Sequence, residues 1–138
     1  MYLLDTNVVS EMRKARAGKI DRNVAKWATG IDLEQMFVSA MTIHEIEIGT
    51  LLVERRDPAQ GKIYRDWLEN DVLPTFGSRA LPVNVEVARV AAAFHVPDRA
   101  GLSDALIAAT AHVHGLTMVT RNISDFSRCG VPLLNPWG

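Results

Sequence analysis

Short apolar runs alternate with helical patterns along this chain. The runs cover residues 2–4, 36–40, 116–120 and 131–134. They largely lack the apolar–polar alternation of a half-exposed strand, which is typical of strands buried on both faces of a parallel sheet. Parallel strands need crossover connections, and these are usually helices. The pattern therefore predicts an α/β domain and leaves the order of the strands open.

Four segments between and beside these runs carry helical patterns. They cover residues 42–53, 59–72, 84–95 and 103–115. In the first, apolar residues recur at intervals of three and four, which gives one apolar face. Pro74 is expected to end the second helix. Ser103 is typical of an N-cap residue and Gly115 of a helix C-terminus, so these two residues are expected to bound the last helix.

Length and composition indicate one globular domain over residues 1–138. Hydrophobic residues make up 48% and charged residues 22%, which excludes a largely disordered chain. Cys129 is the only cysteine, so it cannot form an intramolecular disulfide. No apolar run approaches the roughly 18–20 residues of a membrane-spanning helix, and the first residues lack a basic leader segment. We therefore expect a cytoplasmic protein with no membrane partner.

The charge of the chain is nearly balanced, with 15 basic and 16 acidic residues and a net charge of −1. This balance does not by itself indicate a nucleic-acid-binding protein. Six basic residues nevertheless cluster in one short stretch: Arg13, Lys14, Arg16, Lys19, Arg22 and Lys26. The cluster could neutralise phosphates, or it could be a solvated loop and helix face.

Acidic residues follow the expected strands at their carboxyl ends, where the functional groups of open parallel sheets collect. Asp5 ends the first run, and Glu45 is expected in the first turn of the next helix. Asp104 opens the helix near Ser103, and Asp125 follows the third run. Carboxylates brought together raise one another's pKa unless a cation neutralises them. Mg²⁺ or Mn²⁺ suits such oxygen ligands, and the matching chemistry is phosphodiester hydrolysis.

Each of these acids also has a structural interpretation. Asp5 could satisfy backbone N–H groups in a strand-to-helix turn. Glu45 is the last residue of a capping-box pattern that starts at Thr42. Asp104 could complement a helix dipole, although its apolar neighbours indicate a buried turn in which an acid needs a partner. Asp125 could belong to a turn, so no single acid decides between a site and a structural role.

Four segments, taken in order, resemble the motifs of PIN domains, especially the VapC toxins and their FitB-like branch. They read LDTNVVSE at 4–11, TIHEIEIG at 42–49, SDALIAATA at 103–111 and TRNISDF at 120–126. The tail Asn135–Trp137 is also similar to that branch. The resemblance spans essentially the whole chain. It implies a compact three-layer α/β/α fold with a mainly parallel central sheet.

The resemblance also implies an activity: a toxin of a type II toxin–antitoxin system that hydrolyses RNA with Mg²⁺, or with Mn²⁺. The metal-ligating and catalytic acids carried over by position are Asp5, Glu45 and Asp104. Asp125 would be a fourth catalytic acid, because Asn122 stands where some relatives carry one. The residues expected to hydrogen-bond to the carboxylates are Thr6, Asn7 and Thr120.

The same resemblance implies the partners. A cognate VapB-like or FitA-like antitoxin would occupy the active site with its C-terminal segment and bind operator DNA with its N-terminal part. The toxin itself would form a homodimer and a toxin–antitoxin hetero-oligomer. Residues 59–95 could supply the dimer or the antitoxin surface.

Other side chains favour structural roles. Trp27, Trp67 and Trp137 are expected in the core or at an interface rather than as base-stacking platforms. His112 and His114 lie two residues apart on a helix, so they face different directions and do not form a zinc pair.

Rival classes of protein fit less well. An aspartyl phosphatase needs a second acid where this chain has Asn7, and a receiver domain needs paired acids and a late lysine. A catalytically silent PIN-like scaffold stays open as the alternative.

Overall fold

A five-stranded sheet lies at the centre of the molecule, and the computed structural model describes all residues from 1 to 138. The strands are β1 (Tyr2–Leu4), β2 (Met36–Ser39), β3 (Ala80–Leu81), β4 (Thr117–Val119) and β5 (Leu133–Leu134). Their order across the sheet is β3-β2-β1-β4-β5, and every neighbouring pair is parallel. The predicted parallel α/β architecture is confirmed.

Consecutive residues of the central strands enter different cores, which explains why their sequences do not alternate. Leu3 pairs with Met118, and Leu4 pairs with Val119, across β1 and β4. Leu3 and Met118 belong to one hydrophobic cluster, and Leu4 and Val119 belong to the other. All four side chains are fully buried. Because helices cover both faces of the sheet, consecutive residues at the centre of these strands are apolar.

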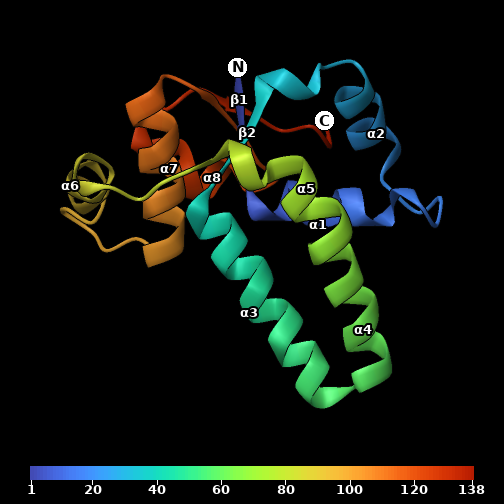
Figure 1. Ribbon diagram of the computed structural model, residues 1–138. Helices are drawn as coiled ribbons and strands as arrows, with labels where there is room; N and C mark the ends of the chain where they lie inside the picture. Colours follow the sequence, from blue (N-terminus) through green and yellow to red (C-terminus); the bar gives the residue numbers. More distant parts are fainter.

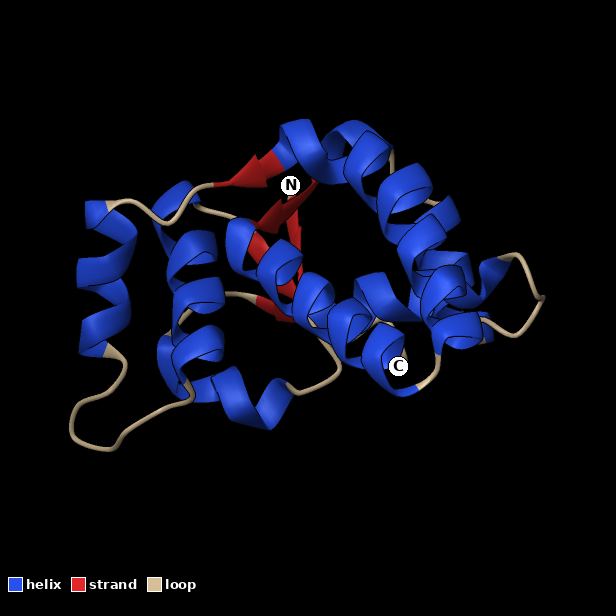
Figure 2. Ribbon diagram, turned by 60° about the horizontal axis from the view of Figure 1, so that its bottom comes forward, coloured by secondary structure: helices blue, strands red, loops and turns tan.

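Helices cover both faces of the sheet, which gives the three layers expected (Figures 1 and 2). One face is covered by α1 (Thr6–Met12), α2 (Arg22–Thr29), α3 (Ala40–Arg56), α4 (Pro58–Trp67), a π-helical turn (Leu68–Val72) and α5 (Leu73–Phe76). The other face is covered by α7 (Leu102–His114) and α8 (Ile123–Phe126), with α6 (Val85–Ala93) packed against α7. Short 3₁₀ turns span Arg13–Ala15, Leu33–Gln35, Gly77–Arg79 and Ser127–Cys129. None of these helices combines the length and hydrophobicity that crossing a membrane requires.

The start of α3 differs from the predicted one. Strand β2 runs directly into the helix, and Ser39 is the N-cap residue, with its Oγ accepting a hydrogen bond from Met41 N at 3.0 Å. Thr42 therefore lies inside the helix, and the capping box that it was expected to begin does not form. Glu45 lies in the second turn, where the N-cap backbone is out of its reach. The structural interpretation of Glu45 is wrong for this reason.

Two further helix boundaries were also predicted wrongly. Helix α7 begins one residue before Ser103, and its N-cap position is held by Gly101 without a side-chain hydrogen bond. Its C-terminus is confirmed, because Gly115 adopts the left-handed conformation at φ 65°. Pro74 does not end the second helical segment but lies within α5. The wider π-helical turn before Pro74 accommodates a residue that lacks a backbone donor.

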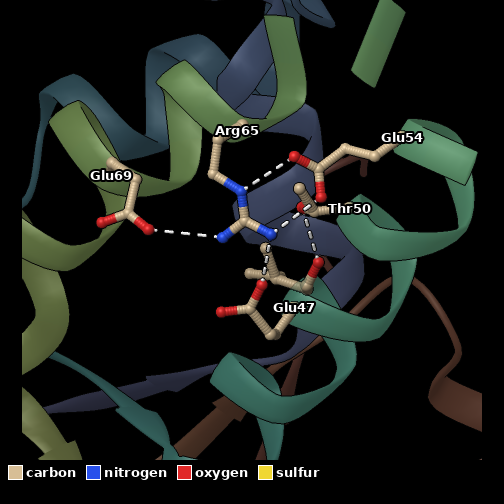
Figure 3. A network of polar contacts seen from close by, with 6 residues as sticks. Glu47, Thr50, Glu54, Arg65 and Glu69 are labelled. Atoms are coloured by element: carbon tan, nitrogen blue, oxygen red, sulfur yellow. Dashed lines mark hydrogen bonds and ion pairs between the residues drawn. The ribbon is translucent and has the colours of Figure 1, made fainter. Parts of the chain in front are cut away.

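Helices α3 and α4 form an antiparallel hairpin that projects from the domain (Figure 1). Gly61 permits their close approach, since a Cβ at this position would lie 2.4 Å from Glu54 Cα. Arg65 of α4 connects the two helices through Glu47 and Glu54 of α3, and it also pairs with Glu69 one turn further along its own segment (Figure 3). Its Nη2 lies 2.8 Å from Glu47 Oε2 and 3.0 Å from Glu54 Oε1. Its Nη1 lies 3.3 Å from Glu69 Oε1.

Candidate active site

Asp5 is the most deeply held acid of the candidate site. It directly follows β1, and its backbone N–H donates to Val119 O at 2.9 Å, which continues the pairing with β4. The carboxylate accepts hydrogen bonds from Thr6 N at 2.7 Å and from Thr120 Oγ1 at 2.8 Å. Asn7 Nδ2 lies 3.4 Å from the same carboxylate. Asp5 therefore caps α1, as the turn interpretation predicted, and at the same time faces the edge of the sheet.

Glu45 reaches the same edge from α3. Thr6 Oγ1 donates to Glu45 Oε1 at 2.7 Å and lies 3.2 Å from Thr42 Oγ1. Because Thr6 N also binds Asp5, one residue positions two of the predicted acids. The predicted hydrogen-bonding roles of Thr6, Asn7 and Thr120 thus correspond to contacts in the structure.

Asp104 and Asp125 differ in their access to the site. Asp104 lies in the first turn of α7 and is partly buried. Asp125 is exposed on α8, and its charge is close enough to raise the pKa of Asp104. Asp5, Glu45 and Asp104 line one cleft, and Asn122, rather than Asp125, lines it as well. Asp125 therefore stands at the periphery of the acids.

A cleft of about 460 Å³ brings the predicted residues together. Its walls include Asp5, Thr6, Asn7, Glu45 and Asp104. Asp5, Thr6 and Asn7 come from the junction of β1 and α1, whereas Glu45 comes from α3 and Asp104 from α7, which are far from that junction and from each other in the sequence. Thr120 is fully buried beneath Asp5.

The pKa values of two cleft acids are raised. Burial raises the pKa of Asp5 to about 6, even though hydrogen bonds from Thr120 and Thr6 oppose the shift, and the charges of Asp104 and Glu45 add to it. The pKa of Asp104 is raised by burial and then by the charges of Glu45 and Asp125. None of Asp5, Glu45 and Asp104 takes part in an ion pair. The three acids thus lie close together without a protein cation paired to them.

This donor set suits a hard divalent cation. The three acids offer only carboxylate oxygens, which are the ligands that Mg²⁺ and Mn²⁺ prefer. Their mutual repulsion is the kind that a bound cation relieves. No three His, Cys, Asp or Glu side chains are already arranged around one point as metal ligands, so binding would require these side chains to adjust.

Glu11 also lines the cleft but is already engaged. Lys14 Nζ lies 3.0 Å from its Oε1, and Asp21 N donates to its Oε2 at 2.8 Å. Burial by itself would raise the pKa of Glu11, but these two hydrogen bonds together with the charge of Lys14 outweigh it and lower the pKa. Glu11 therefore anchors the segment between α1 and α2 and is not expected to bind a metal.

The basic cluster predicted between Arg13 and Lys26 is only partly at the site. Arg13 and Lys14 line the cleft, whereas Arg16 pairs with Asp71 at 2.8 Å on the surface. Arg121, a basic residue outside the predicted cluster, also lines the cleft. Its position directly after Thr120 is at the same strand end as the predicted acids, so the strand-end rule could have found it.

The tryptophans divide into two groups. Trp27 and Trp67 pack against the hydrophobic core, and Trp27 makes an edge-to-face contact with Tyr2 at 5.4 Å between ring centroids. Trp137 also packs against this core, but it lines the cleft as well. The expectation of core positions is thus confirmed for Trp27 and Trp67 and is incomplete for Trp137.

Together, the fold and the cleft define a class: a three-layer α/β domain with an acidic site at the carboxyl edge of a parallel sheet. The family profile described as PIN domain matches residues 2–131, so the chain belongs to the PIN domain family. Ribonucleases of this family generally depend on a divalent metal ion.

Similar proteins cover nearly the full chain. VapC ribonuclease Y4jK from Sinorhizobium fredii is 34% identical over 142 residues, which span 99% of this chain and 98% of the relative. Toxin FitB from Neisseria gonorrhoeae is 34% identical over 143 residues, which span 99% of each chain. The structure of FitAB bound to an IR36 DNA fragment contains a chain with a TM-score of 0.86 and 31% identity, and the match covers 100% of this chain and 96% of that one.

Proposed function

We propose that this protein is the ribonuclease toxin of a toxin–antitoxin system and hydrolyses RNA phosphodiester bonds with Mg²⁺ or Mn²⁺. One observation carries the proposal: carboxylates from three distant segments line one cleft with no protein cation paired to them. The names of the similar proteins, a VapC ribonuclease and a toxin, support it. Residues 1–138 would act as one domain.

In this proposal, Asp5, Glu45 and Asp104 hold the metal ion. When bound, Mg²⁺ stabilises negative charge on a phosphate and lowers the pKa of a coordinated water. Thr6 keeps Glu45 directed toward Asp5 through its two hydrogen bonds. Thr120 and Asn7 restrict the rotation of the Asp5 carboxylate.

Asp125 has a different role in this proposal. Because it is exposed and does not line the cleft, we assign it an electrostatic influence on Asp104 rather than direct metal binding.

The proposed protein partner is a VapB-like or FitA-like antitoxin. An apolar groove of about 420 Å³ runs beside the cleft, with Met12, Ile31 and Phe76 among its walls. Arg13 lines both the groove and the cleft, so one bound segment could occupy the two in succession. Operator DNA would be bound through the antitoxin, as the complex of FitAB with DNA suggests. The toxin would form a homodimer within the toxin–antitoxin complex and act on RNA in the cytoplasm.

RNA cleavage by the purified protein tests the proposed activity. We expect cleavage of a mixed RNA substrate in Mg²⁺ or Mn²⁺ and none in EDTA. Asp104→Asn should abolish this cleavage while the circular dichroism spectrum stays unchanged. Asp32→Asn is the matched control, because Asp32 is exposed and its side chain makes no capping hydrogen bond.

The outcome also separates the enzyme from the scaffold alternative. If the wild-type protein neither binds Mg²⁺ or Mn²⁺ nor cleaves RNA, the ribonuclease proposal is wrong and the fold serves as a binding module.

A further inference from the structure

Thr42 of α3 is a buried polar residue that the proposed function does not use. Its side chain is fully buried and does not line the cleft, whereas Thr6 and Glu45 do. Its hydroxyl group has one hydrogen-bond partner, Thr6 Oγ1 at 3.2 Å. A buried hydroxyl group needs such a partner, because leaving it without one costs free energy. The polar contact of Thr42 is therefore directed at a residue of the candidate site.

The other buried threonines within helices use their hydroxyl groups differently. Thr50 and Thr110 each donate to the backbone carbonyl group four residues earlier, at 2.8 Å and 2.7 Å. This bond is a common one for a threonine inside a helix. For Thr42, the residue four positions earlier is Val38, which belongs to strand β2 rather than to the helix. The hydroxyl hydrogen of Thr42 is consequently available to another side chain.

The hydroxyl groups of Thr42 and Thr6 and the carboxylate of Glu45 form a chain of hydrogen bonds with one direction. An ionised carboxylate only accepts, so the Thr6 hydroxyl group donates its single hydrogen to Glu45 Oε1 at 2.7 Å. Thr6 Oγ1 can then only accept from Thr42, which makes Thr42 the donor of the 3.2 Å bond. A hydroxyl group that accepts one hydrogen bond becomes a stronger donor of the next one. Thr42 thus orients and strengthens the bond from Thr6 to Glu45.

The same contacts join helix α1 to helix α3. Thr6 opens α1, whereas Thr42 and Glu45 lie on one face of α3, three residues apart. No other side-chain hydrogen bond or ion pair connects these two helices. Because Thr6 N also donates to Asp5 at 2.7 Å, the position of Thr6 sets the spacing of the Asp5 and Glu45 carboxylates.

We propose that Thr42 is a positioning residue of the metal site: its hydroxyl group holds Thr6 in the rotamer that directs Glu45 toward Asp5. The inference rests on the proposed metal-dependent function and goes beyond it, since Thr42 neither lines the cleft nor hydrogen-bonds to an acid. Without this hydroxyl group, Thr6 keeps its bond to Glu45 but loses the contact that restricts its own rotation. The carboxylates are then less well ordered before the cation arrives, and the affinity for the cation falls.

Calorimetric titration of the whole protein with Mn²⁺ tests this inference. Thr42→Val keeps the branched shape and removes only the hydroxyl group. It should bind Mn²⁺ about 3- to 10-fold more weakly than wild type, which corresponds to the loss of one neutral hydrogen bond. Thr42→Ser keeps the hydroxyl group and should bind Mn²⁺ within about twofold of wild type. The circular dichroism spectra of both variants should match that of wild type.

Thr50→Val is the matched control. Thr50 lies on the same helix, is also buried and loses its hydroxyl group in the same way. Its hydroxyl group binds only the backbone, and it lies roughly 12 Å further along the helix axis. Thr50→Val should therefore bind Mn²⁺ within about twofold of wild type. A loss of affinity as large as that in Thr42→Val would assign the effect to a general loosening of α3 and overturn the positioning role.

A double-mutant cycle tests whether Thr42 acts through Thr6. Thr6→Val removes the hydrogen bond to Glu45 and should weaken Mn²⁺ binding by about tenfold or more. In the Thr6→Val background, Thr42→Val should cause no further loss, since the partner of Thr42 is already gone. Urea unfolding of the same proteins in EDTA gives a second measurement without metal. There, the two substitutions together should lower the free energy of unfolding by less than the sum of their separate effects.

Equal Mn²⁺ affinity of wild type and Thr42→Val would overturn the positioning role. A further loss caused by Thr42→Val in the Thr6→Val background would overturn it as well, because Thr42 would then act by another route. These failures are distinguishable from failure of the proposed function. A wild-type protein that binds no Mn²⁺ contradicts the metal site itself, whereas a wild-type protein that binds Mn²⁺ no more tightly than Thr42→Val contradicts only the role of Thr42.

Discussion

Two clusters of carboxylates meet on helix α3 and have opposite electrostatic surroundings. Glu45 points into the cleft, where it influences Asp104, and no cation is paired with either residue. Glu47, only two residues further along, faces α4 and pairs with Arg65 (Figure 3). The difference arises because a step of two residues turns a helix to another face.

The direction in which the pKa of an acid is shifted differs between the two clusters, according to whether a cation is paired with the acid. In the cleft, burial and neighbouring charges raise the pKa of Asp5 and Asp104. In the hairpin, the hydrogen bond from Arg65 lowers the pKa of Glu54. Both clusters contain several acids, so a count of acids does not distinguish a site from a structural network. What distinguishes them is whether a protein cation forms ion pairs with the acids, because such a cation removes the need for a bound one.

The largest effect is expected when the same substitution is made in the two clusters. Glu45→Gln should lower metal-dependent RNA cleavage by at least about 100-fold, because it removes a charged metal ligand. Glu47→Gln should leave cleavage within about threefold of wild type, since Glu47 is held by Arg65. Initial rates in saturating Mg²⁺ measure both. Similar losses in the two variants would show that the clusters do not differ in function.

The pH dependence of stability should be governed in part by Asp5. Its pKa in the folded protein is about 6, against an ordinary value of 3.8, so the folded state holds this proton to higher pH than the unfolded state does. Stability of the metal-free protein should therefore fall as the pH rises from about 4 to about 6 and stay lower above that. The difference in pKa corresponds to at most about 3 kcal/mol.

Urea unfolding in EDTA between pH 4 and pH 7.5 measures this effect, with Asp5→Asn as the reference. The variant lacks the titrating group, so its stability relative to wild type should rise across that pH window. A constant difference between the two proteins at all pH values would contradict the raised pKa. Any hydrogen bonds lost by the substitution contribute an offset that does not vary with pH.

The smallest effect is expected in the cluster of acids that are paired with Arg65. Arg65→Met leaves Glu47, Glu54 and Glu69 without their cation and should lower the melting temperature by no more than about 5 °C, because these pairs are partly open to solvent. Cleavage activity should persist at temperatures where the protein is folded. Arg56→Met, at an exposed residue that forms no ion pair, is the control and should melt within about 1 °C of wild type. Loss of cleavage in folded Arg65→Met would tie the hairpin to catalysis.

Much of the fold could be predicted because burial constrains the sequence directly. Strands β1, β2 and β4 lie between two cores, so their residues must be apolar in succession. Strand β3 was not predicted, since its two residues lie between Arg79 and Pro82, whereas the equally short β5 lies within the apolar run 131–134. The start of α3 was misplaced because Ser39 and Thr42 are both good N-cap residues, and the choice depends on where β2 ends.

The site was predictable where a residue adjoins a strand end. The candidate role of Asp5 could be predicted from its place at the end of a strand, whereas that of Glu45 was supported mainly by its surrounding motif. The place of Trp137 in the cleft could not be predicted, because it depends on the tail folding back to Asn23 of α2. Such a contact joins residues that are far apart in the chain and leaves no local pattern.

Metal binding should distinguish the two clusters, because only the cleft acids, and not the acids around Arg65, are proposed to form a cation site. Calorimetric titration with Mn²⁺ and Mg²⁺ would compare wild type, Asp104→Asn and Glu54→Gln. We predict binding to wild type and to Glu54→Gln with closely similar affinity, and a loss of at least about tenfold in Asp104→Asn. Unchanged binding in Asp104→Asn, or a loss confined to Glu54→Gln, would show that the cleft acids are not the cation site.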